Sequence, residues 1–125
     1  MLTRIVFLAL AGAAGTLARY GLGGLVHRFD GAAFPWGTLA ANVVGCMLFG
    51  AVWALSAERG ILSPQVRTVC LIGFLGAFTT FSSYVFETAQ MAAGKQWLLA
   101  AGNFGLENGL GFLALVAGIW LGRIL

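Results

Sequence analysis

Four long apolar runs divide the sequence and restrict what the chain can fold into. They cover about residues 5–26, 36–57, 66–92 and 97–121. A helix needs about 20 apolar residues to cross the hydrocarbon core of a bilayer, so each run is long enough for one span. Short connectors with turn-forming residues, such as Asp30-Gly31 and Gly94-Lys95, separate them. The sequence therefore predicts an all-α integral membrane protein with four transmembrane helices in a single domain, residues 1–125.

The composition agrees with a chain that faces lipid. Apolar residues make up 60% of the 125 residues and charged residues only 9%, which a water-soluble domain of this size could not place on its surface. The 19 glycines lie mostly inside the apolar runs, where they allow membrane helices to approach closely, and the candidate close-packing faces are Gly105-xxx-Gly109 and Gly118-xxx-Gly122. The two cysteines, Cys46 and Cys70, also lie in these runs and are interpreted as packing residues rather than a disulfide.

The basic residues are scattered along the chain and predict little bias in orientation. With four spans, one side of the membrane carries Arg4, Arg59, Arg67 and Arg123, and the other carries Arg28, Lys95 and, if the first span ends early, Arg19. Basic loops favour the cytoplasm, but this difference is small enough for the chain to insert both ways round. No basic cluster could follow a phosphate backbone, so nucleic acid is not an expected partner. Four helices can hardly enclose a sealed pathway alone, which favours a homodimer.

The second span carries two polar side chains at membrane depth. Thr38 and Asn42 lie one helical turn apart and share a face. An amide in lipid costs free energy unless it finds a partner, so Asn42 must face another helix or water. Asn42 is therefore either a structural link between helices or a residue on a pathway.

The third span contains residues that interrupt helices. Gly73 and Gly76 are followed by Thr79-Thr80 and Ser82-Ser83, whose hydroxyls compete for backbone hydrogen bonds, so a break is predicted near residues 76–80. At such a break, free carbonyls favour a cation, and the amino end of the next helix favours an anion. Beyond it, Phe81 and Tyr84 share a face, either as core packing or with their positive ring edges toward an anion.

Three sequence strings resemble the Fluc (CrcB) family of bacterial fluoride channels. They are Gly12-xx-Gly15-xxx-Arg19-Tyr20, Trp36-Gly-Thr38-xxx-Asn42-xx-Gly45 and Gly73-Phe-Leu-Gly76-xx-Thr79-Thr80-Phe81-Ser82, in order over roughly 90 residues. The resemblance implies a fluoride-selective channel that passively exports fluoride from the cytoplasm. It also implies a multi-pass protein of the bacterial cell inner membrane, assembled as a dual-topology antiparallel homodimer.

The same resemblance implies roles for individual residues. Asn42 would be the pathway asparagine, and Phe81 and Tyr84 would turn their ring edges to the ion. A structural Na⁺ at the dimer centre would be held by the backbone carbonyls of Gly76 and Thr79. Further pathway positions would be Thr38, Thr80 and Ser83 as polar neighbours, Arg19 near a vestibule, and Glu87, which could equally be a water-facing helix end.

The fourth span and one aromatic residue depart from the family pattern. Tyr84 stands where phenylalanine is common, and its hydroxyl could assist fluoride or point elsewhere to pack. Asn103 and Glu107 lie one turn apart and can face the same cavity. An ionised carboxylate in lipid is costly, so Glu107 should be neutral, paired with a cation such as Arg19, or exposed to vestibule water. We hypothesise that Glu107 faces the pathway and makes transport pH-dependent; a solvated position near a helix end is the alternative.

Two other functions remain open at this point. A proton-coupled small antiporter of the four-span dual-topology type has a similar length, but its essential glutamate belongs to the first span, which here contains Arg19 and no carboxylate. A non-transporting assembly factor would need only the packing glycines and leaves the polar groups unexplained. An enzyme is not expected, because the single histidine and the two cysteines suggest no catalytic or metal-binding set.

Overall fold

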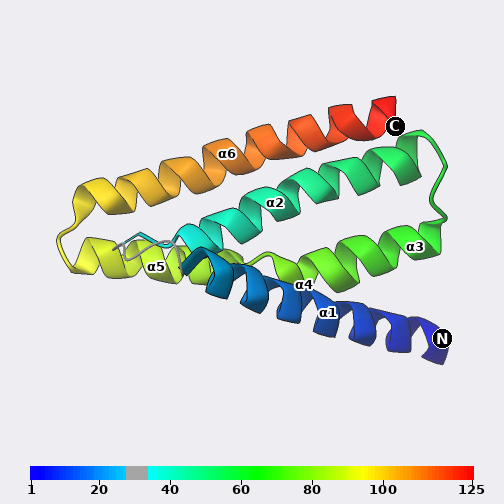
Figure 1. Cartoon of the computed structure of the whole chain (residues 1–125), viewed down its shortest axis with the longest axis horizontal. Coiled ribbons are helices and arrows are strands. Elements are labelled where there is room, and N and C mark those ends of the chain that lie inside the picture. Colours follow the sequence, from blue (N-terminus) through cyan, green and yellow to red (C-terminus); the bar gives the residue numbers. More distant parts are fainter. Residues whose placement is uncertain (28–33) are drawn as a thin grey trace.

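Four helical rods make up the computed structural model, which describes residues 1–27 and 34–125 (Figure 1). The first rod is α1 (Leu2–His27), and the second is α2 (Trp36–Trp53) with its continuation η1 (Ala54–Glu58). The fourth is α6 (Trp97–Ile124). Each rod is long and apolar enough to cross a membrane, which confirms the all-α fold with four spans. Arg28 and the Asp30-Gly31 turn signal lie outside the described residues.

The third rod consists of several helical segments. It contains α3 (Pro64–Thr68), the π-helix η2 (Val69–Leu75), α4 (Gly76–Phe78) and α5 (Phe81–Ala93). Ser63 caps its start by accepting a hydrogen bond from the Val66 backbone N–H at 3.3 Å, with Pro64 at the first helical position. The predicted spans fall inside the four rods, which extend a few residues further at several ends.

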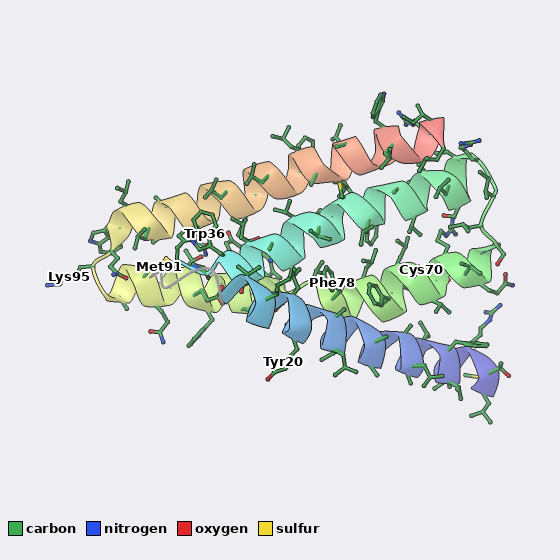
Figure 2. The ribbon with its side chains drawn as sticks, in the orientation of Figure 1. Tyr20, Trp36, Cys70, Phe78, Met91 and Lys95 are labelled. Atoms are coloured by element: carbon green, nitrogen blue, oxygen red, sulfur yellow. The ribbon has the colours of Figure 1, made fainter. Side chains whose placement is uncertain are left out.

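The rods pack around α2. Figure 1 shows both termini at one end of the bundle, and Figure 2 shows Lys95 in the α5–α6 turn at the other, as an even number of spans requires. The most extensive contact is between α2 and α6, while α1 packs along η2 and α4, and α5 packs on α6. A small core of Ala41, Leu71, Leu75 and Phe78 joins α2 to the third rod.

Glycines bring α2 and α6 into backbone contact. A Cβ on Gly118 would collide with the Met47 carbonyl, and one on Gly122 would come within 2.6 Å of the Ala51 carbonyl oxygen. The predicted small-residue face at Gly118 and Gly122 is therefore a helix contact within the chain. In contrast, a Cβ on Gly105 would meet nothing within 4 Å, so this second candidate face is unused inside the described chain.

Substituting Gly118 with alanine is expected to destabilise the fold. The added methyl group has no space against the α2 backbone, and overpacking of this kind costs about 1–3 kcal/mol. Thermal unfolding of purified protein in detergent would measure the loss. Gly21→Ala is the matched control, because its new methyl group meets nothing within 4 Å and alanine favours a helix. Equal melting temperatures for the two variants would contradict the predicted close contact.

Candidate functional site

The third rod is interrupted by two residues in extended conformation. Thr79 has φ −84° and ψ 160°, and Thr80 has φ −150° and ψ 105°. A new helix begins at Phe81, where the Thr80 hydroxyl oxygen accepts a hydrogen bond from the Ser83 N–H at 3.3 Å. The predicted break near residues 76–80 is confirmed. It begins at Thr79, and the residues Gly76–Phe78 before it still form a short helix.

The side-chain amide of Asn42 fills this break. Its Oδ1 accepts from the Thr80 backbone N–H at 2.7 Å, and its Nδ2 donates to the Thr80 carbonyl at 3.2 Å. The amide thus satisfies both polar groups of an interrupted backbone, as a break at membrane depth requires. Nδ2 also donates to Glu107 Oε2 at 3.0 Å. Asn42 therefore has the structural role that the sequence left open, linking α2 to α5 and α6.

Two glycines of the sequence strings allow the neighbouring helices to approach the break. A Cβ on Gly45 would collide with the Thr79 methyl group, and a Cβ on Gly15 would collide with the Phe74 carbonyl. Both glycines are buried. The close contact of α1 and α2 with the third rod thus depends on glycine at these positions.

A cavity of about 500 Å³ lies on one side of Asn42, between α1, α2 and α5. Its wall includes five of the predicted pathway residues: Arg19, Thr38, Thr80, Ser83 and Glu87. The Thr38 hydroxyl donates to Glu87 Oε1 at 2.8 Å, and the Thr80 hydroxyl donates to Ser83 Oγ at 2.9 Å. Glu87 lies in the middle of α5, so its alternative placement at a water-facing helix end is wrong. We call this space the first cavity.

A second cavity, of about 390 Å³, contains the aromatic residues and Glu107. Its wall is formed by Asn42, Gly45, Cys46, Phe49, Thr79, Phe81, Tyr84, Glu107, Asn108 and Leu115. The rings of Phe81 and Tyr84 meet edge to face, with centroids 5.5 Å apart. Among residues 1–27 and 34–125, none lines both cavities. The Asn42 amide binds Thr80 of the first cavity and Glu107 of the second, so it lies between them.

The hydroxyl of Tyr84 points to α6. Asn108 Nδ2 donates to Tyr84 Oη at 3.0 Å and to the Phe104 carbonyl of its own helix at 2.7 Å. Tyr84 is only 6% exposed, whereas Phe81 is 75% exposed in the single chain. The tyrosine hydroxyl thus holds its ring in place. Sequence reasoning missed the partner, Asn108, because the pair forms between different helices.

Glu107 is buried in the wall of the second cavity. Its side chain is 7% exposed, and α6 continues for many residues on both sides, so the predicted alternative of a solvated helix end is wrong. Arg19 lines the other cavity, and no ion pair between the two residues is present in the described part of the chain. Glu107 is bonded instead to Asn42.

Asn103 lies one turn from Glu107 but lines neither cavity. It is 0% exposed and donates through Nδ2 to Thr88 Oγ1 at 2.8 Å, which in turn donates to the Tyr84 carbonyl. Three buried oxygens around this region have no hydrogen-bond partner within residues 1–27 and 34–125. They are Glu87 Oε2, Asn103 Oδ1 and Glu107 Oε1.

The predicted sodium ligands lie at the break, with carbonyls that lack their usual helical donors. In a helix the Gly76 carbonyl would accept from the Thr80 N–H, which is bonded to Asn42 instead. The Thr79 carbonyl would accept from the Ser83 N–H, which is bonded to the Thr80 hydroxyl. Unwound carbonyls and the carboxyl ends of half-helices coordinate Na⁺ in membrane proteins, so Thr79 in the break and Gly76 in the last turn before it fit this ion.

These features define a class of protein: a small multi-pass membrane protein with a broken helix whose backbone is held by an amide between two cavities that contain polar side chains. Residues 6–119 match the family model described as CrcB-like protein, Camphor Resistance (CrcB). The chain belongs to this family.

Bacterial relatives match the chain over its whole length. A protein of Solidesulfovibrio magneticus is 51% identical over 125 residues, which is 100% of both chains. Relatives from Desulforapulum autotrophicum, 49% identical over 98% of both chains, and Nitrosococcus oceani, 46% identical over 100% of both, are similar. Each of these relatives is named a fluoride-specific ion channel, FluC. The chain is thus a multi-pass membrane protein of a bacterial cell.

Proposed function

We propose that this chain is a fluoride-selective ion channel that passively exports fluoride from the cytoplasm, and that it is not an enzyme. The names of its full-length relatives support this function. The structural observation that carries the proposal is the Asn42 amide, which joins the broken third helix between two cavities that contain polar side chains. The first cavity serves as an aqueous vestibule, and the second contains the narrow part of the pathway.

The polar groups along this route are suited to a small anion. Arg19 gives the first cavity a cation that attracts anions, and the carboxyl group of Glu87 lies in the same wall. The hydroxyls of Thr38, Thr80 and Ser83 and the amide of Asn42 follow, and then the rings of Phe81 and Tyr84. Hydroxyls, amides and positive ring edges replace the water shell of fluoride without a fixed cation that would trap the ion. Asn103 contributes indirectly, since it supports α5 through Thr88.

The functional unit of the proposal is an antiparallel homodimer of dual topology. Phe81 lines the second cavity and yet remains largely exposed in the single chain. Gly76, whose carbonyl lacks its usual donor, is also exposed. Free backbone groups do not face lipid in the hydrocarbon core, which supports a second chain packed against the break. The accessibility of a tag at one terminus tests the dual topology, and we expect the tag to be equally accessible from both sides of the membrane.

A Na⁺ ion at the dimer centre would be held by Gly76 and Thr79 of both chains. Bound there, the ion would neutralise the negative ends of these carbonyl dipoles and would join the two protomers. Replacing Na⁺ with N-methylglucamine is therefore expected to lower the dimer fraction of purified protein, measured by light scattering at fixed protein concentration. A dimer fraction that is the same in both cations would contradict this site.

The physiological role follows from acid–base chemistry. Neutral HF crosses membranes, dissociates in the less acidic cytoplasm and accumulates there as the anion, which cannot return through lipid. A passive and selective pathway for fluoride is then sufficient to limit its toxicity. No coupling to a proton gradient is needed, which distinguishes this proposal from the small antiporter.

Ion efflux from liposomes tests the proposed function. Liposomes containing the purified protein are loaded with potassium fluoride or potassium chloride, a potassium ionophore is added, and each anion is recorded with an ion-selective electrode. We expect rapid fluoride loss with chloride retained, and no requirement for a pH gradient. Retention of fluoride by liposomes with folded protein would contradict the channel, and fluoride loss only with a pH gradient would favour the antiporter.

A further inference from the structure

The amide nitrogen of Asn42 has no free N–H group. The backbone N–H of Thr80 can only donate, so the atom of Asn42 that faces it is Oδ1, and Nδ2 is assigned to the other side. The two hydrogens of Nδ2 are then used on the Thr80 carbonyl and on Glu107 Oε2. An ion at this point can gain an N–H of Asn42 only if one of these acceptors gives it up.

Of the two acceptors, Glu107 is the one that can be displaced. The Thr80 carbonyl belongs to the backbone of the break. The Asn42 amide that donates to this carbonyl also accepts a hydrogen bond from the Thr80 N–H, so the two bonds hold each other in place. Glu107 is a side chain in the wall of the second cavity, and its Oε1 has no partner in residues 1–27 and 34–125. Its bond to Asn42 is thus the only hydrogen bond of the carboxyl group within these residues.

A carboxylate and fluoride seek the same donor. Both are anions: the carboxylate accepts through an oxygen atom, and fluoride is a small halide. Each binds N–H groups through charge-assisted hydrogen bonds. The carboxylate is attached to α6, so its effective concentration at Asn42 is high and does not depend on the solution. In contrast, the carboxylate of Glu58 is bonded to Arg123 at 2.6 Å and 3.0 Å and lies far from this site at the end of the second rod.

We propose that Glu107, in its ionised form, is a tethered competitor of fluoride for the Asn42 amide. The proposal rests on the proposed function. At low fluoride concentration the carboxylate occupies the donor and slows passage, and at higher concentration fluoride displaces it. The same side chain thus sets the fluoride concentration at which the channel reaches half of its maximal flux.

Protonation of the carboxyl group would weaken this competition, because the neutral group is a poorer acceptor and no longer repels an anion. The other titratable groups near Glu107 are Cys46 from α2 and Tyr84 from α5, which share its cavity, and Glu87 from α5, which lines the first cavity. Arg19 of α1 lines the first cavity. Flux through the wild-type protein is therefore expected to rise as pH falls, after subtraction of HF leak through protein-free liposomes.

Two substitutions separate competition from a merely structural role. Glu107→Gln keeps an oxygen acceptor for Asn42 but removes the charge, and Glu107→Ala frees the N–H completely. We expect both substitutions to lower the fluoride concentration for half-maximal flux by about tenfold. This factor corresponds to the lower limit of the free energy of one charge-assisted hydrogen bond. We also expect Glu107→Gln to lose the pH dependence. Glu58→Gln is the matched control and should behave as the wild type.

The measurements are liposome flux at varied fluoride concentration and calorimetric titration of fluoride into the folded dimer in detergent. Folded Glu107→Gln with unchanged concentration dependence and pH profile, or with weaker fluoride binding, would overturn the proposal. Absence of fluoride flux from wild-type liposomes would overturn the proposed function instead, and the titration would still report the competition at Asn42.

Discussion

Asn42→Ala is expected to lower fluoride flux by at least about 100-fold, which corresponds to about 2.7 kcal/mol in the barrier. The substitution removes the pathway donor and also both bonds to Thr80. It leaves the N–H and C=O of Thr80 unpaired beside the break, and each unsatisfied buried group costs about 1–3 kcal/mol. The break would then relax, so the spacing of Thr80 and Phe81 along the route would change as well.

Flux per folded dimer in liposomes, together with the melting temperature, checks this result. Asn108→Ala is the matched control, because it removes an asparagine from the second cavity without touching the break. We expect that variant to keep flux within about threefold of the wild type, because only one of the two neutral hydrogen bonds that it removes reaches a pathway residue, Tyr84. Wild-type flux from folded Asn42→Ala would contradict both the pathway role and the importance of the amide at the break.

Tyr84→Leu is expected to lower fluoride flux by about tenfold or more, whereas Tyr84→Phe should stay within about threefold of the wild type. The edge-to-face pair with Phe81 requires an aromatic ring, and leucine supplies no positive edge for an anion. Phenylalanine loses only the bond from Asn108, whose Nδ2 also donates to the Phe104 carbonyl and so stays satisfied.

The comparison of these two variants separates the ring of Tyr84 from its hydroxyl. Efflux from liposomes with equal numbers of folded dimers would measure both. If Tyr84→Phe lost as much flux as Tyr84→Leu, the hydroxyl would be the group that matters, and the ring-edge interpretation would be wrong. If neither lost flux, the route would not pass this ring.

The fold could be predicted from the sequence because the bilayer allows few alternatives. Four apolar runs of sufficient length must form four spans, and two hydroxyl pairs after glycines must interrupt a helix somewhere. The exact place of the break could not be predicted. Gly73 and Gly76 suggested an early start, but a Cβ on Gly73 would come within 2.8 Å of the Ala11 side chain, so this glycine serves helix packing.

The residues of the two cavities were mostly visible as polar groups at membrane depth, but their partners were not. Whether Glu107 faces Arg19, water or Asn42 depends on the rotation of α6 against α2, which backbone contacts at Gly50 and Gly118 determine. The Tyr84–Asn108 bond depends on the same rotation. The spacing of residues along one helix shows which of them share a face. It does not show how two helices are rotated against each other.

The Asn42 bonds to the break also bear on how the protein responds to temperature. One amide links α2 to the third rod, and glycine contacts hold α2 against α6, so the helices around the route are joined by direct contacts. A carrier that rocks between two orientations must break such contacts in every cycle, at a large activation enthalpy. Ions crossing a scaffold that stays assembled need only small side-chain displacements, so their rate should vary with temperature almost as weakly as diffusion in water.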